Sequence, residues 1–521
     1  MSRCPVPALF CLALLLSMPG AGTAQEAGGP EAASNALPEM AEIEAAYARG
    51  DYAVVREMLS QLAPATGDPQ AQYRYGRALI EGIGGPVEPA SGVMWLGRAA
   101  DAHHAAAATL LARVYLSDLD GVPRDPAAAR DLLAIAAPRG DAAAQTLLGY
   151  MLRSGTGGEA DPKAAFGWFL AAAEQGEPDA MLALARAYAR GEGTEADSGT
   201  AETWLRRAAE DGQIEAQVRL AQALTERGPE SASEAVTWFR SAAEAGNPLG
   251  ARGLGTAYLT GTGVAANPDA AEEWLTRAAE AGDAGAMFNL GVSYASGTGL
   301  AVNDAAALRW LRAAADKGLP RAHAPLGALL EAGRGGPPDL DAAIKHYRDG
   351  AEAGDPAAVI ALGKLAGSGA LEGRVAPQRA VPWAAAAAAD GDAEAETWLR
   401  ARAEAGEGAA QYALAALKLD RDGAEADGAD WLDRAARSGH AVAQDRLGRL
   451  YMTGGAGLPQ DMVAAHAWLN LAGAGGLASA REARDLAAEV MTPDQIAEAQ
   501  TRAATLRSEV SEPQAPTASG Q

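Results

Sequence analysis

Apolar and small residues recur along most of this chain with the spacing of one helical face, and the segments that carry them come in pairs. Residues 283–318 show the pattern. Asp283 can cap a first helix, and Gly297-Thr298-Gly299 ends that helix because glycine tolerates the positive φ of a tight turn. Asp304 opens a second helix, which carries the run Trp310-Leu-Arg-Ala-Ala and stops at the next glycine. The pattern predicts helical hairpins, and no segment of the sequence is typical of a strand.

The hairpin recurs at a nearly constant interval, mostly 36 or 37 residues between equivalent turn positions. These turn positions are Gly67, His103, Gly140, Gly176, Gly212, Gly246, Gly282, Gly318, Gly354, Gly391, Gly406, Gly439 and Gly476. One step, from Gly391 to Gly406, is only 15 residues long. A period of this length is typical of a solenoid, in which each unit packs only against its neighbours. We predict an all-α fold, an α/α superhelical solenoid of about eleven helix-turn-helix repeats with helical caps.

All 10 tryptophans occupy one position of the repeat, eight residues before a turn position. They are Trp95, Trp168, Trp204, Trp238, Trp274, Trp310, Trp383, Trp398, Trp431 and Trp468. A residue type confined to one phase of a repeat is set by packing, whereas a catalytic residue would usually be needed once. We expect each indole to fill the gap between its own helix pair and the next, burying roughly 150–250 Å².

The pattern Gly-Asp-x-x-Ala-x-x-x-Leu-Gly-x-x-Tyr-x-x-Gly-x-Gly, followed by Ala-x-x-Trp-Leu-x-x-Ala-Ala, resembles the Sel-one-like repeat, a relative of the tetratricopeptide repeat. Residues 282–315 carry it almost complete, and the segment from Leu458 to Trp468 resembles the last repeats of bacterial members. The resemblance extends from about Glu39 to Arg507. It implies an adaptor with no shared catalytic residue. Bacterial secreted members are often envelope regulators, host-contact factors or assembly scaffolds.

The first residues are typical of a secretory signal peptide. Arg3 supplies a positive end, Val6–Met18 is mostly apolar, and Gly22-Thr23-Ala24 offers small residues for cleavage. A membrane anchor is the alternative, but the apolar stretch is short for a helix that spans a bilayer. Both cysteines, Cys4 and Cys11, fall inside this segment, so the mature chain would have no thiol or disulfide. We expect a periplasmic or secreted protein with no stable membrane insertion after signal removal.

The repeat and its interruptions divide the chain into segments. We predict a signal peptide at 1–24, a disordered linker at 25–38, an N-terminal capping helix pair at 39–67, a repeat array at 68–391, an irregular step at 392–406, a second stretch of array at 407–476, C-terminal capping helices at 477–507 and a disordered tail at 508–521. A net charge of −24, spread through the helices, argues against a nucleic-acid partner because phosphates would be repelled.

Candidate chemistry is sparse. The only adjacent histidines, His103 and His104, point about 100° apart on a helix and have no third ligand in register, so we expect no metal site. His346 stands in the tryptophan position and is interpreted as a packed substitute. Glycine-rich pieces follow helices and lack a Gly-Lys-Ser/Thr sequence, so they are turns and not phosphate loops. We expect no catalytic residue and no cofactor.

Polar side chains on the first helix of each pair are the candidate binding residues, because in tetratricopeptide-like arrays that helix lines the concave face. Positions seven and ten after the turn carry Arg74, Arg77, Arg186, Arg219, Gln222, Asn289, Lys364, Arg446 and Arg449. Such a row of donors could take an acidic peptide. The alternative is that these arginines are solvated and pair with neighbouring carboxylates.

These observations favour a secreted or periplasmic helical-repeat scaffold that binds a protein or peptide partner on its concave face, in envelope signalling or assembly. The alternative is a periplasmic enzyme or a cell-wall or β-lactam-interacting protein. Some secreted relatives have been linked to β-lactam binding, but those are cysteine-rich, and this mature chain would contain no cysteine.

Overall fold

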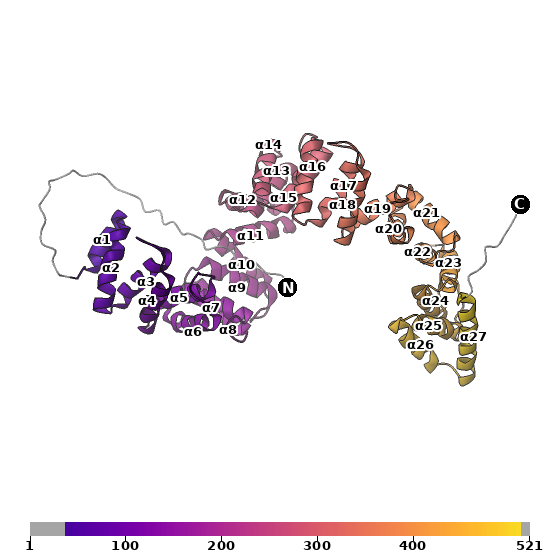
Figure 1. The fold of residues 1–521 in the computed structure, drawn as a ribbon, viewed down its shortest axis with the longest axis horizontal. Coiled ribbons are helices and arrows are strands. Elements are labelled where there is room, and N and C mark those ends of the chain that lie inside the picture. The colour runs from indigo at the N-terminus through magenta and orange to yellow at the C-terminus, as the bar shows by residue number, and fades with distance from the viewer. Residues whose placement is uncertain (1–36, 422, 512–521) are drawn as a thin grey trace. The chain divides into compact units, whose positions relative to one another are not determined.

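The computed structural model describes residues 37–421 and 423–511. Within these residues the fold is all-α: helices α1–α27 follow one another with short 3-10 turns and without a strand (Figure 1). Eleven helix pairs form the repeats, and one more pair precedes them, which confirms the predicted α solenoid. The helices divide into two compact units between Glu177 and Pro178, at a turn whose sequence follows the ordinary repeat.

The first unit contains an N-terminal pair, α1 and α2, and three repeats, α3–α8. Its helices are α1 (Met40–Arg49), α2 (Tyr52–Thr66), α3 (Pro69–Glu81), α4 (Pro89–Asp101), α5 (Ala105–Leu116), α6 (Pro126–Ala136), the 3-10 turn η1 (Ala137–Arg139), α7 (Ala142–Ser154) and α8 (Pro162–Glu174).

The second unit contains eight repeats, one unpaired helix and two closing helices. Its helices are α9 (Pro178–Arg190), α10 (Ser198–Glu210), α11 (Ile214–Arg227), η2 (Pro229–Ser231), α12 (Ala232–Glu244), α13 (Pro248–Thr260), α14 (Pro268–Glu280), α15 (Ala284–Ser296), α16 (Asp304–Asp316), η3 (Pro320–Ala322), α17 (His323–Glu331), α18 (Leu340–Glu352), α19 (Pro356–Gly367), α20 (Pro377–Ala389), α21 (Ala393–Glu404), α22 (Gly408–Leu419), α23 (Glu425–Arg437), α24 (Ala441–Thr453), α25 (Met462–Ala474), α26 (Ala478–Glu489) and α27 (Pro493–Ser511).

Capping side chains and turn residues explain why each helix begins and ends where it does. Asp283 caps α15 as predicted, because Ala286 N donates to its carboxylate at 2.6 Å. The second helix of that repeat, α16, is capped by Asn303 and begins at Asp304. His103 replaces the turn glycine and takes the same left-handed backbone, with φ 63°.

The two helices of a repeat pack together through the side chain of the residue that follows tryptophan. Leu311 is fully buried, whereas Trp310 beside it is half-buried. A Cβ built on Gly291 would lie 2.6 Å from Leu311 Cγ, so this glycine leaves the space that leucine fills. The same contact recurs at Gly76–Leu96, Gly149–Phe169, Gly255–Leu275, Gly327–Tyr347 and Gly448–Leu469. Each of these hairpins is therefore joined by a small-to-large contact between its own two helices.

The tryptophans lie beside this contact, and the prediction that each is a buried wedge is wrong for eight of the ten. Only Trp95 and Trp468 are buried, and the others are half-buried. Arginine guanidinium groups lie over many of the indoles: Arg98 over Trp95, Arg207 over Trp204, Arg277 over Trp274, Arg309 over Trp310, Arg402 over Trp398 and Arg434 over Trp431. Each such cation–π contact contributes about 0.5–1 kcal/mol at an exposed site. Neighbouring positions on a helix point about 100° apart. The residue after each tryptophan, and not the tryptophan itself, therefore faces the first helix of the repeat.

The short step at 392–406 holds a single helix, α21, instead of irregular chain. Glu396 on α21 accepts hydrogen bonds from Lys418 Nζ at 3.1 Å and from Arg421 Nη1 at 2.7 Å. Burial alone would raise the pKa of Glu396, but the hydrogen bonds and charges of Arg421 and Lys418 outweigh it and lower that pKa to about 2. This ion cluster ties the unpaired helix to α22 and the turn that follows it.

The last helix begins as predicted and ends later than predicted. Gln495 N donates to Thr492 Oγ1 at 3.3 Å and Thr492 N donates to Gln495 Oε1 at 2.9 Å, which is the expected capping box. Because α27 continues to Ser511, residues 508–511 are helical and do not belong to a tail.

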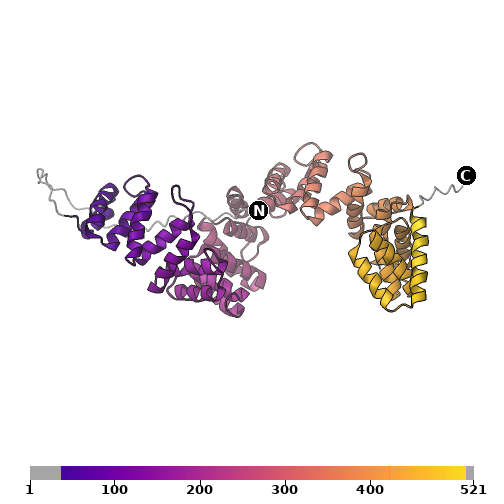
Figure 2. The same cartoon turned by 60° about the horizontal axis from the view of Figure 1, so that its bottom comes forward.

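The C-terminal helix α27 packs back along α25 (Figure 2). Leu506 on α27 lies in the same core cluster as Trp468, which explains why this tryptophan is buried while most others are not. The predicted signal peptide at 1–24, most of the predicted linker at 25–38 and the end of the predicted tail at 508–521 lie outside the described residues.

Candidate binding surface

The predicted binding residues all lie on the first helices of their repeats. Arg74 and Arg77 belong to α3, Arg186 to α9, Arg219 and Gln222 to α11, Asn289 to α15, Lys364 to α19, and Arg446 and Arg449 to α24. We call the outward side of these helices, together with that of α1 in the N-terminal pair, the first-helix surface. The two compact units carry separate stretches of it.

Most of the arginines on the first-helix surface already have an acidic partner. Arg74 Nη2 lies 2.7 Å from Glu44 Oε1 on α1, and Arg77 Nε lies 3.0 Å from Glu81 Oε1, one turn along α3. In the second unit the ion pairs are Arg446–Asp420 at 3.6 Å and Arg449–Asp445 at 2.9 Å. Exposed pairs of this kind contribute about 0–1 kcal/mol each, so a partner's carboxylate could exchange with them at little cost.

Glu215 on α11 is the centre of the densest cluster on this surface. It pairs with Arg186 of the preceding first helix and, at 2.8 Å, with Arg219 of its own helix. Burial alone would raise the pKa of Glu215, but the hydrogen bonds and charges of the two arginines outweigh it, so that pKa lies below its usual value. One carboxylate shared by two guanidinium groups leaves a local excess of positive charge.

The remaining predicted residues show less interaction with acidic groups. Asn289 Nδ2 donates to Thr256 Oγ1 on α13 at 3.1 Å, and Lys364 is exposed. Gln222 lines a pocket of about 380 Å³ between α11, α12 and α13, together with Phe239 and Arg252. The first-helix surface therefore offers hydrogen-bond donors, but the structure shows many of them in intramolecular contacts.

In the first unit, α1, α2 and α3 enclose a pocket of about 530 Å³ on this surface. Arg74 and Arg77 lie in its lining beside Tyr47 and Tyr73. Tyr47 is 47% exposed, and Tyr73 stacks on His104 with ring centroids 4.9 Å apart. Aromatic faces beside guanidinium groups suit a peptide that carries both apolar and acidic side chains.

A second pocket of the same kind lies in the other unit, between α20 and α22, with about 590 Å³. Tyr412 in its lining stacks on His440, with centroids 4.8 Å apart. His440 also caps α24, because Ala443 N donates to its Nδ1 at 3.2 Å. Burial lowers the pKa of His440, which favours the neutral ring that such a cap needs.

The stacked tyrosine–histidine pairs beside both pockets were not predicted from the sequence. Tyr73 and Tyr412 each stand six residues after a turn position, and His104 and His440 each stand one residue after the next comparable turn. The recurrence of these positions can be seen in the sequence. The stacking of each tyrosine on its histidine cannot, because the two residues belong to the first helices of different repeats.

The comparisons with known proteins agree with this architecture. The sequence model of the Sel1 repeat matches more than half of the chain, at residues 69–104, 105–141, 142–177, 178–213, 214–247, 248–283, 284–319, 320–355 and 441–477. The chain belongs to the Sel1 repeat family, which confirms the resemblance seen in the sequence. Between 355 and 441, where the unpaired helix α21 lies, no repeat is matched.

One solved structure resembles most of the chain. It is that of c5321, described as a protective antigen present in uropathogenic Escherichia coli strains and displaying an SLR fold. It shares 27% identity, covers 89% of this chain and 99% of its own length, and gives a TM-score of 0.57. A Sel1 repeat protein from Oxalobacter formigenes shares 26% identity over 66% of this chain and 98% of its own, with a TM-score of 0.46. The curated proteins compared with this chain include no match.

The Sel1 repeat fold is a scaffold for protein–protein interaction, and the tandem helices described above are of this kind. None of the helices within residues 37–421 and 423–511 combines the length and the apolar content needed to cross a bilayer.

Proposed function

We propose that this protein is a secreted or periplasmic scaffold that binds a protein or peptide partner on its first-helix surface, in envelope signalling or assembly, and catalyses no reaction itself. The observation that carries the proposal is the tandem array of Sel1 repeats, nine of which match the family model. A solenoid of this kind exposes one helix of every repeat along an extended surface, and such surfaces bind partners.

The side chains on that surface support a partner with carboxylates and apolar groups. The pocket of the first unit combines Tyr47 and Tyr73 with Arg74 and Arg77. In the second unit, Arg186 and Arg219 share a single carboxylate. An acidic peptide segment could replace these intramolecular pairs and place an apolar side chain against the tyrosines.

The main support for export from the cytoplasm is the sequence of the first residues. Arg3, the apolar run Val6–Met18 and the small residues at 22–24 favour a cleaved signal peptide. The description of c5321 as a protective antigen fits a family member that acts outside the cytoplasm.

A photo-crosslinking residue at Tyr47 tests the proposed surface. The matched control is Met94 on the second helix α4, since Tyr47 is 47% exposed and Met94 is 45% exposed. After irradiation with a native envelope fraction, we expect a discrete crosslinked partner from position 47 and none from position 94. Equal crosslinking from both positions, or crosslinking from position 94 alone, would contradict the proposed surface.

A further inference from the structure

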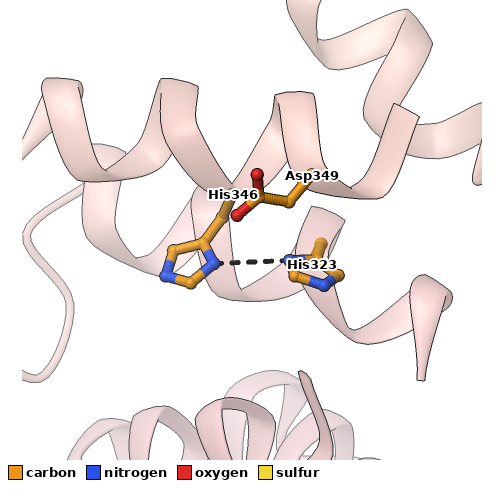
Figure 3. Close-up of side chains that lie close together, drawn as sticks. All are labelled: His323, His346 and Asp349. Atoms are coloured by element: carbon orange, nitrogen blue, oxygen red, sulfur yellow. Dashed lines mark hydrogen bonds between the residues drawn. The ribbon is translucent and has the colours of Figure 1, made fainter. Parts of the chain in front are cut away.

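Two histidines that are 23 residues apart in the sequence meet in the hairpin formed by α17 and α18. His323 Nδ1 lies 3.3 Å from His346 Nδ1, and the carboxylate of Asp349 lies beside them, with all three ligand atoms within 4.8 Å of one another (Figure 3). His346 and Asp349 are one turn apart on α18, so they present their side chains on the same side of that helix.

Both histidines replace other residues of the repeat. His346 stands where ten repeats or part-repeats carry tryptophan. His323 stands five residues after its turn, where glutamine occurs at 72, 145, 217, 411 and 444. At four of these positions the glutamine Nε2 donates to the carbonyl of an alanine eight residues earlier in the chain, at 2.9–3.2 Å. Two departures from the repeat therefore fall in one hairpin, and the side chains they introduce face each other.

The spacing of the two nitrogens suits a shared metal ion better than a hydrogen bond. An N–H···N bond at 3.3 Å is long, and it requires one ring to donate at Nδ1 while the other accepts. A tetrahedral Zn²⁺ with two imidazole nitrogens at about 2.0–2.1 Å holds those nitrogens about 3.3–3.4 Å apart. The observed separation is the one that such an ion would need.

We propose that His323, His346 and Asp349 form a binding site for a divalent late transition metal, Zn²⁺ in particular, with water completing the tetrahedron. Neutral imidazole and carboxylate are ligands that Zn²⁺ takes in proteins. The carboxylate of Asp349 reaches the ion by a change of side-chain rotamer, since its side chain is partly exposed. The site does not depend on the proposed partner surface.

The surroundings of the site contain charges of both signs. Lys345 and Arg312 repel a cation, and burial together with His323 and these two groups lowers the pKa of His346. A second carboxylate offsets the positive charges. Asp355 is 8% exposed, and its Oδ2 has no hydrogen-bond partner within the described residues.

Gly350 brings these groups together. It stands four residues after His346, where most repeats carry alanine, and a Cβ on it would lie 2.9 Å from His323 Cβ and 3.7 Å from Asp355 Oδ2. The missing side chain therefore permits the close approach of α17 to α18 that aligns the two rings. A bound ion would link the two helices of this hairpin.

The test is a calorimetric Zn²⁺ titration of the full chain, prepared without a histidine tag, together with thermal unfolding with and without Zn²⁺. We expect one Zn²⁺ per chain and a higher Tm in its presence, because an ion that binds only the folded state stabilises it. The variants His323→Gln and His346→Trp restore the residues that other repeats carry, so they remove ligands while keeping the hairpin packing. Each should weaken Zn²⁺ binding at least tenfold and abolish the rise in Tm, and Asp349→Asn should weaken binding as well.

His103→Gly is the matched control, since it removes an exposed histidine and restores the usual turn residue. This variant should bind Zn²⁺ as the parent chain does. Binding that is equally tight in His323→Gln and His346→Trp, or the lack of a one-to-one complex with the parent chain, would overturn the site.

Discussion

The contact between glycine and the residue after tryptophan gives a sharp stability prediction. A Cβ on Gly291 would lie 2.6 Å from Leu311 Cγ and 3.1 Å from Leu311 N. Alanine in a helix is ordinarily about 0.5–1 kcal/mol more stable than glycine. Here the overlap should cost about 1–3 kcal/mol, so Gly291→Ala should destabilise the chain despite its better helix propensity. Leu311→Ala, at a fully buried site, should cost about 2–5 kcal/mol.

The double variant separates packing from simple loss of apolar area. Alanine at 311 removes the Leu311 side-chain atoms that a methyl group at 291 would overlap and leaves only its 3.1 Å approach to the backbone N of residue 311. Gly291→Ala should therefore cost less in the Leu311→Ala background than in the parent chain. The loss of unfolding free energy in the double variant should be smaller than the sum of the losses in the two single variants, by about 1 kcal/mol or more. Gly167 on α8 is the control, because a Cβ there meets no atom within 4 Å, and Gly167→Ala should stabilise by about 0.5–1 kcal/mol.

The assay is chemical unfolding followed by circular dichroism, with amide hydrogen exchange to report on α15 and α16 separately, since a long array need not unfold in one step. Additive effects of the two substitutions, or a stabilising effect of Gly291→Ala, would refute the proposed contact.

Two further predictions concern ionisable groups. Glu396→Gln should destabilise α21 by about 1–2 kcal/mol at pH 7, since Lys418 and Arg421 lose their shared anion. The folded-state pKa of Glu396 is about 2, below its usual value. The stability difference between the parent chain and Glu396→Gln should therefore persist above about pH 4.5 and vanish as the pH falls towards 2. Thermal unfolding of both chains at pH 7 and near pH 2 measures this difference. The lowered pKa of His440 means that the folded chain loses stability as the pH drops below about 6.5. His440→Asn keeps a capping oxygen for Ala443 N. Between pH 7 and pH 5 the Tm of this variant should fall less than that of the parent chain. An equal fall in Tm would contradict the capping role of His440.

The sequence predicted the elements of this fold because each helix end carries its own local cause. Turn glycines and capping residues such as Asp283 act within a few positions, so they can be recognised without knowledge of tertiary structure. The burial of Leu311 instead of Trp310 could not be recognised in this way, because both are apolar and differ only in which helix they face. The glycine nine residues after the turn was the available indication, since it marks where a large residue enters.

The candidate site was predicted less completely, because its contacts join different helices. The arginines stand on the first helices as expected, but the partner of Arg186 is Glu215, which lies on the next first helix. The cluster of His323 and His346 was not predicted for a related reason: the two histidines are 23 residues apart and meet only when α17 packs against α18. Comparing each repeat with the others would have shown that one hairpin contains both substitutions.

The most direct test of partner binding compares two charge reversals, each of which breaks an ion pair between residues one helical turn apart. Arg219 on the first helix α11 pairs with Glu215 one turn away, and Arg277 on the second helix α14 pairs with Glu273 in the same spacing. The tagged chain and its Arg219→Glu and Arg277→Glu variants would be used to recover partners from a native envelope fraction. We expect Arg277→Glu to recover the same partner as the parent chain and Arg219→Glu to lose it. Undiminished recovery by Arg219→Glu would contradict binding on the first-helix surface.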